Sequence, residues 1–484
     1  MSVRVLIVGA GEAGQMLARE IRVRASDRYT VVGFLDDDRS LVGKMVADIS
    51  VLGVCDDLSD VVRDERPDEV IIAVPTAERS FIRHVIALCR DAGVPFRIVP
   101  GLLEIIHGPV HLEQIRDASP EDLLGRESVH FDMNAIAECL AGKTVLVTGA
   151  GGSIGAEICR QIGLFPLRRL VLLGRGENQV YDVEQQMRTA YPQLETVSVI
   201  ADIRDRPALQ RRFAEHTPQF VYHAAAHKHV HYMEAFPCEA VKNNVVGTWN
   251  VIQVAGQTGV DRVVMLSTDK AVNPHGVMGA TKRIAEYLMK SSDQPGRTRY
   301  ITVRFGNVLG SRGSVVPLFI RQIREGRAVT VSDAEATRFF MSVREASMLV
   351  VQASIMGQGG EVYILKMGRP IRILELARDL IALHGLRPGA DVEVKFTGMR
   401  PGEKLHEDLV APGEKTVESP HEQIIRSLAA LPDGFDAAGC VRALRECAEG
   451  GNDEGVRRLL SSWIPDASLR HDAPGRCSGG STRV

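Results

Sequence analysis

The chain is 484 residues long, too long for one hydrophobic core, and this length predicts about two or three domains. Its 58 lysines and arginines are balanced by 61 acidic residues, so the formal charge is only −3 and no basic excess points to nucleic acid or an anionic membrane as a partner. The eight cysteines form no CxxC pair, which favours reduced thiols in a cytoplasm over disulfides or a metal site. No uninterrupted apolar run has spanning length, so we expect no integral membrane segment.

The N-terminal region has the pattern of a Rossmann-like domain. The β-branched run Val5–Val8 is followed by a glycine-rich turn and a helical pattern, the order that opens a nucleotide-binding βαβ unit. The turn glycines are Gly9, Gly11 and Gly14. Further strands are expected at Val31–Leu35, Val70–Val74 and Phe96–Val99, and a helix at Phe81–Ala92. Because Asp36 ends the second strand, a second dinucleotide site is one interpretation of this domain, and a non-catalytic accessory domain is the other.

The same order of strand, glycine turn and helix restarts at Lys143, where Val145–Val147 precedes TGAGGSIG. Later strands are expected at Leu170–Leu173, Thr196–Ala201, Phe220–His223, Arg262–Ser267 and Tyr300–Arg304. The predicted fold class is therefore α/β, with two tandem Rossmann-like domains. The expected parts are an accessory domain at 1–125, a linker at 126–142, a catalytic domain at 143–410 with a small substrate lobe mainly at 306–410, a helical extension at 411–470 and a disordered tail at 471–484.

The second glycine turn predicts a nicotinamide dinucleotide site, because glycines let a pyrophosphate approach the N-terminus of the following helix. The next strand ends at Leu173-Gly174-Arg175 with no acid, which favours NADP, although NAD stays open. The expected cofactor-binding residues are Gly149, Gly152, Ser153, Ile154, Gly155, Arg175, Asp202, Ile203, Ala224, Ala225 and Lys282. Asp202 is equally well explained as a helix cap.

The segment at 263–290 carries the residues expected to perform the chemistry. Its first part predicts a buried parallel strand, and open α/β sheets bind ligands at the carboxyl ends of such strands. The residues that emerge at this end are Thr268, Asp269 and Lys270. Met278 and Lys282 follow on a helix, four residues apart and facing the same way.

Motifs along nearly the whole chain resemble those of a known family. They are GEAG, GFLDDD, EDLLGRE, KTVLVTGAGGSIGAEICRQI, YHAAAHKHVHYMEAFPCEAVKNNVVGT, LSTDKAVNPHGVMGATKR, RFGNVLGSRGSVVPLF, TRFFM and MRPGEKLHEDL. The chain resembles the extended short-chain dehydrogenase/reductases, and within them the polysaccharide-biosynthesis dehydratases that act on UDP-N-acetylglucosamine, in their long form with an N-terminal Rossmann-like domain. Long-form members commonly carry membrane helices ahead of that domain, and this sequence has none. Met278 stands where an ordinary member has a tyrosine base. One branch of the family likewise has a methionine at this position.

The resemblance implies 4,6-dehydration of a UDP-N-acetylhexosamine with a tightly held, recycled NADP or NAD. It implies Lys270 as the base at C5 and Asp269 as the acid for the C6 hydroxyl. Lys282 is expected to bond the nicotinamide ribose and to ease deprotonation at C4. The Met278 thioether has no titratable proton and is expected only to pack, so Thr268 is our candidate for receiving the C4 proton.

Residues in or near glycine-rich turns are expected to line the substrate, and arginines among them suit its diphosphate. The expected substrate-binding residues in these turns are Asn307, Arg312, Arg338 and Arg400, with Glu403 in support. The resemblance adds Lys228 and His229, which follow the small run Ala224–Ala226, as residues that line the sugar site. A metal held by the alternating His227, His229 and His231 is disfavoured, because no carboxylate or cysteine partner has matching spacing. Asn244 resembles the structural asparagine of the fold.

The expected partner is a UDP-sugar, and the resemblance implies a homo-oligomer. Two other functions stay open. One is a nucleotide-sugar 4-epimerase or reductase, which would need a tyrosine base. The other is a non-catalytic nucleotide-sugar sensor, suggested by the missing tyrosine and the additional domain.

Overall fold

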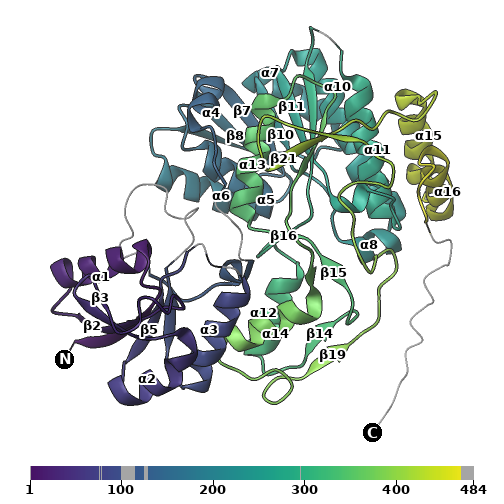
Figure 1. The fold of residues 1–484 in the computed structure, drawn as a ribbon. Helices are drawn as coiled ribbons and strands as arrows, with labels where there is room; N and C mark the ends of the chain where they lie inside the picture. The colour runs from purple at the N-terminus through teal and green to yellow at the C-terminus, as the bar shows by residue number, and fades with distance from the viewer. Residues whose placement is uncertain are drawn as a thin grey trace. The chain divides into compact units, whose positions relative to one another are not determined.

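The structure is a computed structural model, and it describes residues 2–75, 77, 79–99, 115–124, 129–294 and 296–469. The predicted tail at 471–484 and the predicted domain boundary at 125–126 lie outside the described residues. The chain divides into two compact units (Figure 1). The first unit comprises residues 1–130, 315–331 and 373–396, and the second comprises residues 131–314, 332–372 and 397–484.

The first unit is built on a six-stranded sheet of order β3-β4-β2-β1-β5-β6, parallel except for β3. Its strands are β1 (Val3–Val8), β2 (Tyr29–Leu35), β3 (Met45–Val46), β4 (Ile49–Gly53), β5 (Glu69–Ile72) and β6 (Phe96–Ile98). Its helices are α1 (Glu12–Arg24), η1 (Cys55–Asp57), α2 (Leu58–Glu65), α3 (Arg79–Asp91) and η3 (Pro120–Leu124). The β-branched strands β1 and β5 are buried at the centre of the sheet, as expected for parallel strands covered on both faces.

Two later segments belong to the same unit. They contribute α12 (Val315–Arg324), β14 (Val329–Val331), α14 (Ile373–Leu383) and β19 (Val394–Phe396). β14 and β19 form a separate parallel pair, and α14 packs on both α12 and α3. An ion pair of 2.7 Å between Arg83 of α3 and the buried Asp379 of α14 joins these segments to the N-terminal domain. Much of the predicted substrate lobe therefore groups with the N-terminal sheet, while the predicted domain boundaries themselves stay predictions.

The second unit is built on a nine-stranded sheet of order β20-β21-β17-β12-β11-β10-β7-β8-β9. Its strands are β7 (Thr144–Thr148), β8 (Arg169–Gly174), β9 (Glu195–Ile200), β10 (Phe220–His223), β11 (Arg262–Leu266), β12 (Arg299–Arg304), β17 (Val362–Leu365), β20 (Thr416–Glu418) and β21 (Ile424–Ser427). Strands β7 to β17 are parallel, and β20 and β21 form an antiparallel edge. Short pairs join β13 (Asn307–Val308) to β16 (Phe340–Met341) and β15 (Thr337–Arg338) to β18 (Ile371–Arg372).

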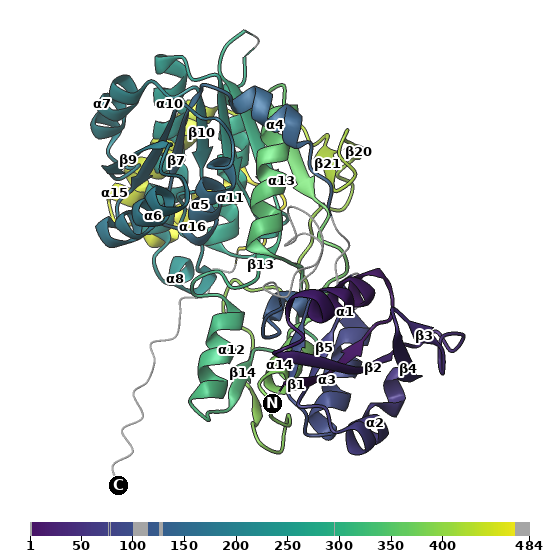
Figure 2. The same ribbon diagram turned by 90° about the vertical axis from the view of Figure 1, so that its left-hand side faces the viewer.

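Helices cover both faces of this sheet (Figures 1 and 2). One layer holds α4 (Met133–Leu140), α5 (Ser153–Ile162), α6 (Glu177–Ala190) and α13 (Val343–Met356). The other holds α7 (Arg206–His216), α10 (Thr248–Thr258) and α11 (Val277–Ser292), with α15 (Ala437–Glu449) and α16 (Asp453–Trp463) packed outside α11. The short elements α8 (Val230–Ala235), α9 (Pro237–Ala240), η4 (Val241–Gly247) and η5 (Asp269–Ala271) lie in the loops between strands. The predicted α/β class and the two Rossmann-like sheets are confirmed.

The strands predicted from β-branched runs match the observed ones to within two residues at either end. Within the described residues, no helix is both long and apolar enough to cross a membrane.

Candidate active site

The glycine turn after β7 has the shape that a dinucleotide requires. Gly149 has a φ of +67°, and a Cβ there would lie 2.7 Å from the backbone nitrogen of Ala225. A Cβ at Gly155 would collide with the carbonyl oxygen of Gly149, so the first turn of α5 packs directly on the loop. Gly152 stands at the N-cap of α5, where free backbone N–H groups and the helix dipole favour phosphate. These residues fit the pyrophosphate of a nicotinamide dinucleotide.

Two arginines lie at the ribose end of this turn. Arg175 follows the last residue of β8 and is exposed. Arg204 forms a bidentate pair with Asp202, with contacts of 2.8 to 3.1 Å. Burial raises the pKa of Asp202, but Arg204 and Arg175 outweigh it and lower the pKa. Arg204 also lies 3.1 Å from Glu239, so two carboxylates balance its charge and Arg175 is left as an exposed cation, while Ile203 is buried against Gly247.

The carboxyl end of β11 leads directly into the predicted catalytic residues Thr268, Asp269 and Lys270. Asp269 and Lys270 lie in the single turn η5, and Thr268 precedes this turn. The Thr268 hydroxyl donates to Oδ1 of Asp269 at 2.8 Å, and Nζ of Lys270 donates to the same oxygen at 3.0 Å. Asp269 is fully buried, and its Oδ2 has no hydrogen-bond partner among the described residues. An unsatisfied buried carboxylate oxygen is costly, and a catalytic role is one of the reasons for which such an atom is retained.

Lys270 is surrounded by acceptors. Besides Asp269, its Nζ donates to Oδ1 of Asn307 at 3.1 Å and lies 3.5 Å from Oε1 of Glu407. Burial alone would lower the pKa of Lys270, but Asp269 and Glu407 outweigh burial and raise it. Arg338 lies 3.9 Å from the same oxygen of Glu407. The resting Lys270 is therefore an ammonium ion held by three oxygens.

Helix α11 brings Met278 and Lys282 to the same edge. Gly279 allows this approach, because a Cβ there would collide with the carbonyl oxygen of Lys270. Met278 is buried and Lys282 is 5% exposed. Burial lowers the pKa of Lys282 to about 8, against the opposing charge of Glu286. Lys282 thus sits near its titration point at physiological pH.

Glu286, one turn further along α11, is the centre of a buried charge network. It accepts from Ser267 at 2.6 Å, from Arg304 at 2.9 and 3.2 Å, and from Arg283 at 3.0 Å. Burial opposes ionisation, yet the two arginines lower the pKa of Glu286 to about 2. Arg304 also pairs with Glu414 at 3.1 Å. The network fixes the end of β11, immediately before Thr268, against α11.

The predicted substrate residues fall into two groups. Lys228 donates to Ser311 at 3.3 Å, and a Cβ at Gly313 would lie 2.5 Å from the His229 ring, so both residues meet the loop at 311–313. The backbone N–H of Arg312 donates to Ser153 of the dinucleotide turn at 3.0 Å, while its side chain is exposed. This first group therefore lies beside the glycine turn.

The second group lies on the turn at 400–407. Arg400 is exposed, and Arg400 and Glu403 both act electrostatically on His231. Lys404 anchors the turn by donating to the carbonyl of Val272 at 2.8 Å. Asn307 and Arg338, expected to bind the diphosphate or uracil, instead contact Lys270 and Glu407 in this structure; their contacts with substrate stay predictions.

Asn244 braces the loop that carries the predicted sugar-site residues. Its side chain accepts from the backbone N–H of His227 at 2.8 Å and donates to the carbonyl of the same residue at 3.0 Å. It also donates to Thr281 of α11 at 3.1 Å. Asn244 is buried within the π-helical segment η4, a distortion often found at functional sites.

Sequence reasoning missed Glu407 and Glu286. Glu407 lies at the end of MRPGEKLHEDL, and only its reach to Lys270 across 137 residues of chain distinguishes it from its acidic neighbours. Glu286 follows Lys282 by four residues, a spacing that places both on one face of the helix. That spacing was the available signal for Glu286, and no comparable signal exists for Glu407.

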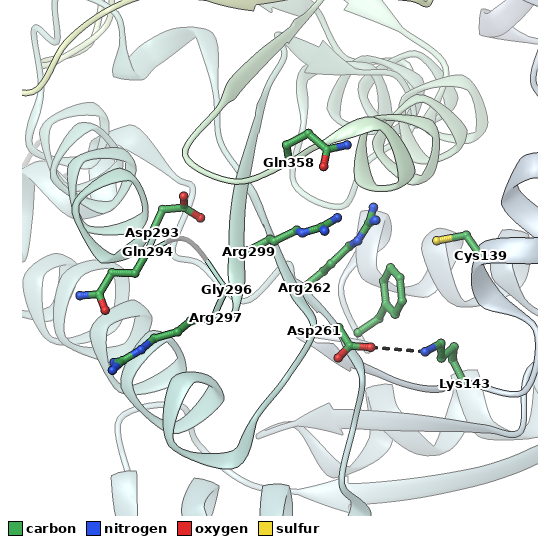
Figure 3. A pocket seen from close by; sticks show the side chains of 11 residues that line it. Cys139, Lys143, Asp261, Arg262, Asp293, Gln294, Gly296, Arg297, Arg299 and Gln358 are labelled. Carbon is green, nitrogen blue, oxygen red and sulfur yellow. Dashed lines mark hydrogen bonds and ion pairs between the residues drawn. The ribbon is translucent and has the colours of Figure 1, made fainter.

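A cavity lies at the opposite edge of the second sheet, where β10, β11 and β12 begin (Figure 3). The lining residues are Cys139, Lys143, Phe220, Asp261, Arg262, Asp293, Gln294, Gly296, Arg297, Arg299 and Gln358. Lys143 and Asp261 pair across it at 3.3 Å. Because ligands of open α/β sheets bind at the carboxyl ends of the strands, this cavity is not the reaction site.

Comparison with known proteins identifies the family. Residues 145–429 match the family described as polysaccharide biosynthesis protein. The chain belongs to this family. The capsular polysaccharide biosynthesis protein CapD of Staphylococcus aureus is 44% identical over 424 residues, which cover 87% of this chain and 71% of CapD. A UDP-glucose 4-epimerase of Rickettsia massiliae is 34% identical over 279 residues, 56% of this chain and 79% of the epimerase. Residues 1–100 match a CoA-binding domain.

Solved structures agree in fold. Pen from Bacillus thuringiensis superposes with a TM-score of 0.56 at 31% identity, covering 63% of this chain and 97% of Pen. The dTDP-glucose 4,6-dehydratase DesIV from Streptomyces venezuelae, solved with NAD and TYD bound, has a TM-score of 0.50 at 22% identity, covering 67% of this chain and 99% of DesIV. This member of the polysaccharide biosynthesis family thus shares its fold with a nucleotide-sugar dehydratase and is similar in sequence to a nucleotide-sugar epimerase.

Proposed function

We propose that this protein removes water from a UDP-N-acetylhexosamine, most simply UDP-N-acetylglucosamine, to give a 4-keto-6-deoxy sugar nucleotide. One observation carries the proposal: an amine and a fully buried acid, Lys270 and Asp269, lie 3.0 Å apart at the carboxyl end of β11, with no tyrosine at position 278. An epimerase needs only a base at C4, whereas a dehydratase needs a base at C5 and an acid at C6. The pair supplies one group for each.

The glycine turn would hold the cofactor, and the exposed Arg175 after β8 favours NADP over NAD. When bound, the nicotinamide supplies a hydride acceptor for C4 and returns the hydride to C6. Lys282 would bond the nicotinamide ribose and place positive charge near the C4 oxygen. Arg312, Lys228 and His229, beside the glycine turn, would bind the diphosphate and the sugar.

The proton of the C4 hydroxyl has a path that needs no tyrosine. Oγ1 of Thr268 takes this proton while its own passes to Oδ1 of Asp269, 2.8 Å away. Asp269 becomes a neutral acid by this transfer, as protonation of the departing C6 hydroxyl requires. The water that leaves is therefore the C6 hydroxyl plus one proton from Asp269, which replaces the proton that the C4 hydroxyl gave up. Asp269 ends the step as a carboxylate again. General acid–base steps of this kind typically contribute roughly 10² to 10⁴ in rate.

A 4-epimerase is the second candidate, favoured by the likeness to the rickettsial protein of that name. Incubation of the purified protein with UDP-N-acetylglucosamine, followed by mass spectrometry of the sugar nucleotide, separates the two. The dehydratase proposal predicts loss of one water. An unchanged mass with a new configuration at C4 would favour the epimerase, and an unchanged sugar with cofactor bound would favour a sensor.

A further inference from the structure

The C5 base of this site is not ready to act in the arrangement observed. The Lys270 ammonium donates to Asp269 at 3.0 Å and to Asn307 at 3.1 Å, and its Nζ lies 3.5 Å from Oε1 of Glu407 as an ion pair. An ammonium ion has no lone pair, so it cannot accept the C5 proton. Lys270 must first lose a proton, and at neutral pH a carboxylate that already lies against its Nζ is the nearest receiving group.

Among the three acceptors, only Glu407 is free for this task. Asn307 presents a neutral amide oxygen, which is not a useful proton acceptor. Asp269 shares its Oδ1 between Thr268 and Lys270 and is already assigned the proton from C4. Glu407 has a side chain only 2% exposed, and its Oε2 has no hydrogen-bond partner among the described residues. A carboxyl group in this setting is stabilised by holding a proton.

The charges around Glu407 come from three parts of the fold. Lys270 and Asp269 face it from η5, Arg338 from β15, and Lys404 from its own segment. Burial, together with the nearby Asp269, raises the pKa of Glu407, while the three cations oppose this. The balance favours the protonated form compared with an ordinary glutamate.

We propose that Glu407 is the positioning residue that accepts a proton from Lys270 and so converts it into the amine that removes the C5 proton. This role rests on the proposed dehydration. An Nζ–H bond of Lys270 breaks and an O–H bond forms at Oε1 of Glu407, leaving both groups neutral. The amine then takes the C5 proton, and the C5–H electrons form the C5–C6 double bond as Asp269 protonates the departing C6 hydroxyl. After hydride reaches C6, Lys270 returns a proton to C5 and recovers its own from Glu407.

The test measures two steps separately in Glu407→Gln, Glu407→Asp and the exposed control Glu422→Gln. C5 exchange is followed by NMR of the sugar in deuterated water, and C4 oxidation is followed by cofactor absorbance in single turnover. In Glu407→Gln we expect C5 exchange at neutral pH to fall by roughly 10² or more, while C4 oxidation falls less than about ten-fold. Exchange in this variant should rise with pH, because Lys270 must then lose its proton to solvent. Glu407→Asp should recover part of the exchange, and Glu422→Gln should match the wild type.

Three results would overturn the proposal. Exchange in Glu407→Gln at the wild-type rate and with the wild-type pH profile would show that another group takes the proton. Equal losses in exchange and oxidation, unrelieved in Glu407→Asp, would show a purely structural role. If the wild type shows no C5 exchange, both the proposed dehydration and the role of Glu407 are wrong. If the wild type exchanges C5 and Glu407→Gln does so equally well, only the role of Glu407 is wrong.

Discussion

The buried ammonium of Lys282 should make C4 oxidation sensitive to mildly alkaline pH. Its side chain lies on α11 with 5% exposure, and burial lowers its pKa from the ordinary 10.5 to about 8 despite the nearby Glu286. The proposed role needs the cationic form, because positive charge near the C4 oxygen eases loss of its proton. Since a lysine is cationic below its pKa, activity should be full below about pH 8 and fall as the pH rises through it.

The size of the effect follows from the same shift. The difference between 10.5 and about 8 corresponds to about 3 kcal/mol of unfavourable burial of the charge. Above the midpoint, each further pH unit lowers the cationic fraction about ten-fold, so the logarithm of the rate of C4 oxidation should approach a slope of about −1 against pH. A surface lysine would produce no such limb until above about pH 10.

The assay is single-turnover C4 oxidation from about pH 6 to about pH 10 in the wild type, Lys282→Arg and Lys290→Arg. Arginine stays charged throughout this range, so Lys282→Arg should lose the alkaline limb, even if its maximal rate is lower. Lys290 lies two turns further along the same helix, and its substitution should leave the limb in place. A flat wild-type profile, or the same limb in Lys282→Arg, would refute the assignment.

Three other predictions concern the supports of the site. Glu286→Gln should lower the thermal midpoint by about 5 °C or more at neutral pH, because a carboxyl whose pKa is about 2 instead of 4.5 contributes on the order of 3 kcal/mol. That contribution is present above pH 4.5 and is lost as the pH falls toward 2, so the difference from wild type should shrink in acid; a constant difference would contradict it. Arg175→Ala should weaken NADP binding by roughly 10- to 100-fold in fluorescence titrations and NAD binding far less. Equal losses for the two cofactors would show that Arg175 does not contact the 2′-phosphate. Arg457→Ala should lower kcat several-fold. Arg457 of α16 pairs with Glu234 at 2.6 Å, and Glu234 caps α11 by accepting the N–H of its first residue, Val277, at 2.5 Å. Unchanged kinetics would show that this cap does not position α11.

The elements of both sheets were predictable because their sequences carry strong local signals. The runs Val5–Val8 and Val145–Val147 are β-branched, fully apolar and closed by glycine turns, so local preference and burial agree. Thr268, Asp269 and Lys270 were predictable as a site because they directly follow such a strand. Each of these signals lies within a few neighbouring residues.

The remaining features depend on contacts that no local pattern encodes. Glu407 reaches Lys270 from a turn with no regular secondary structure. The segments at 315–331 and 373–396 pack with the N-terminal sheet, partly through the buried Asp379, although they lie between parts of the second unit in sequence. The Asp36 carboxylate, a possible ribose ligand, accepts the backbone N–H of Ala10 at 2.7 Å and so braces its own glycine turn, and its contact with a dinucleotide stays a prediction. Long-range packing decides the first two cases.

The most direct test of the account follows one hydrogen atom. UDP-N-acetylglucosamine deuterated at C4 is incubated with the wild-type protein, and the product is analysed by NMR and mass spectrometry. The account predicts loss of one water with the deuterium transferred to C6, because the hydride removed from C4 is returned there. Deuterium that remains at C4 in a sugar nucleotide of unchanged composition would contradict the dehydration and, with it, the roles assigned to Asp269 and Lys270.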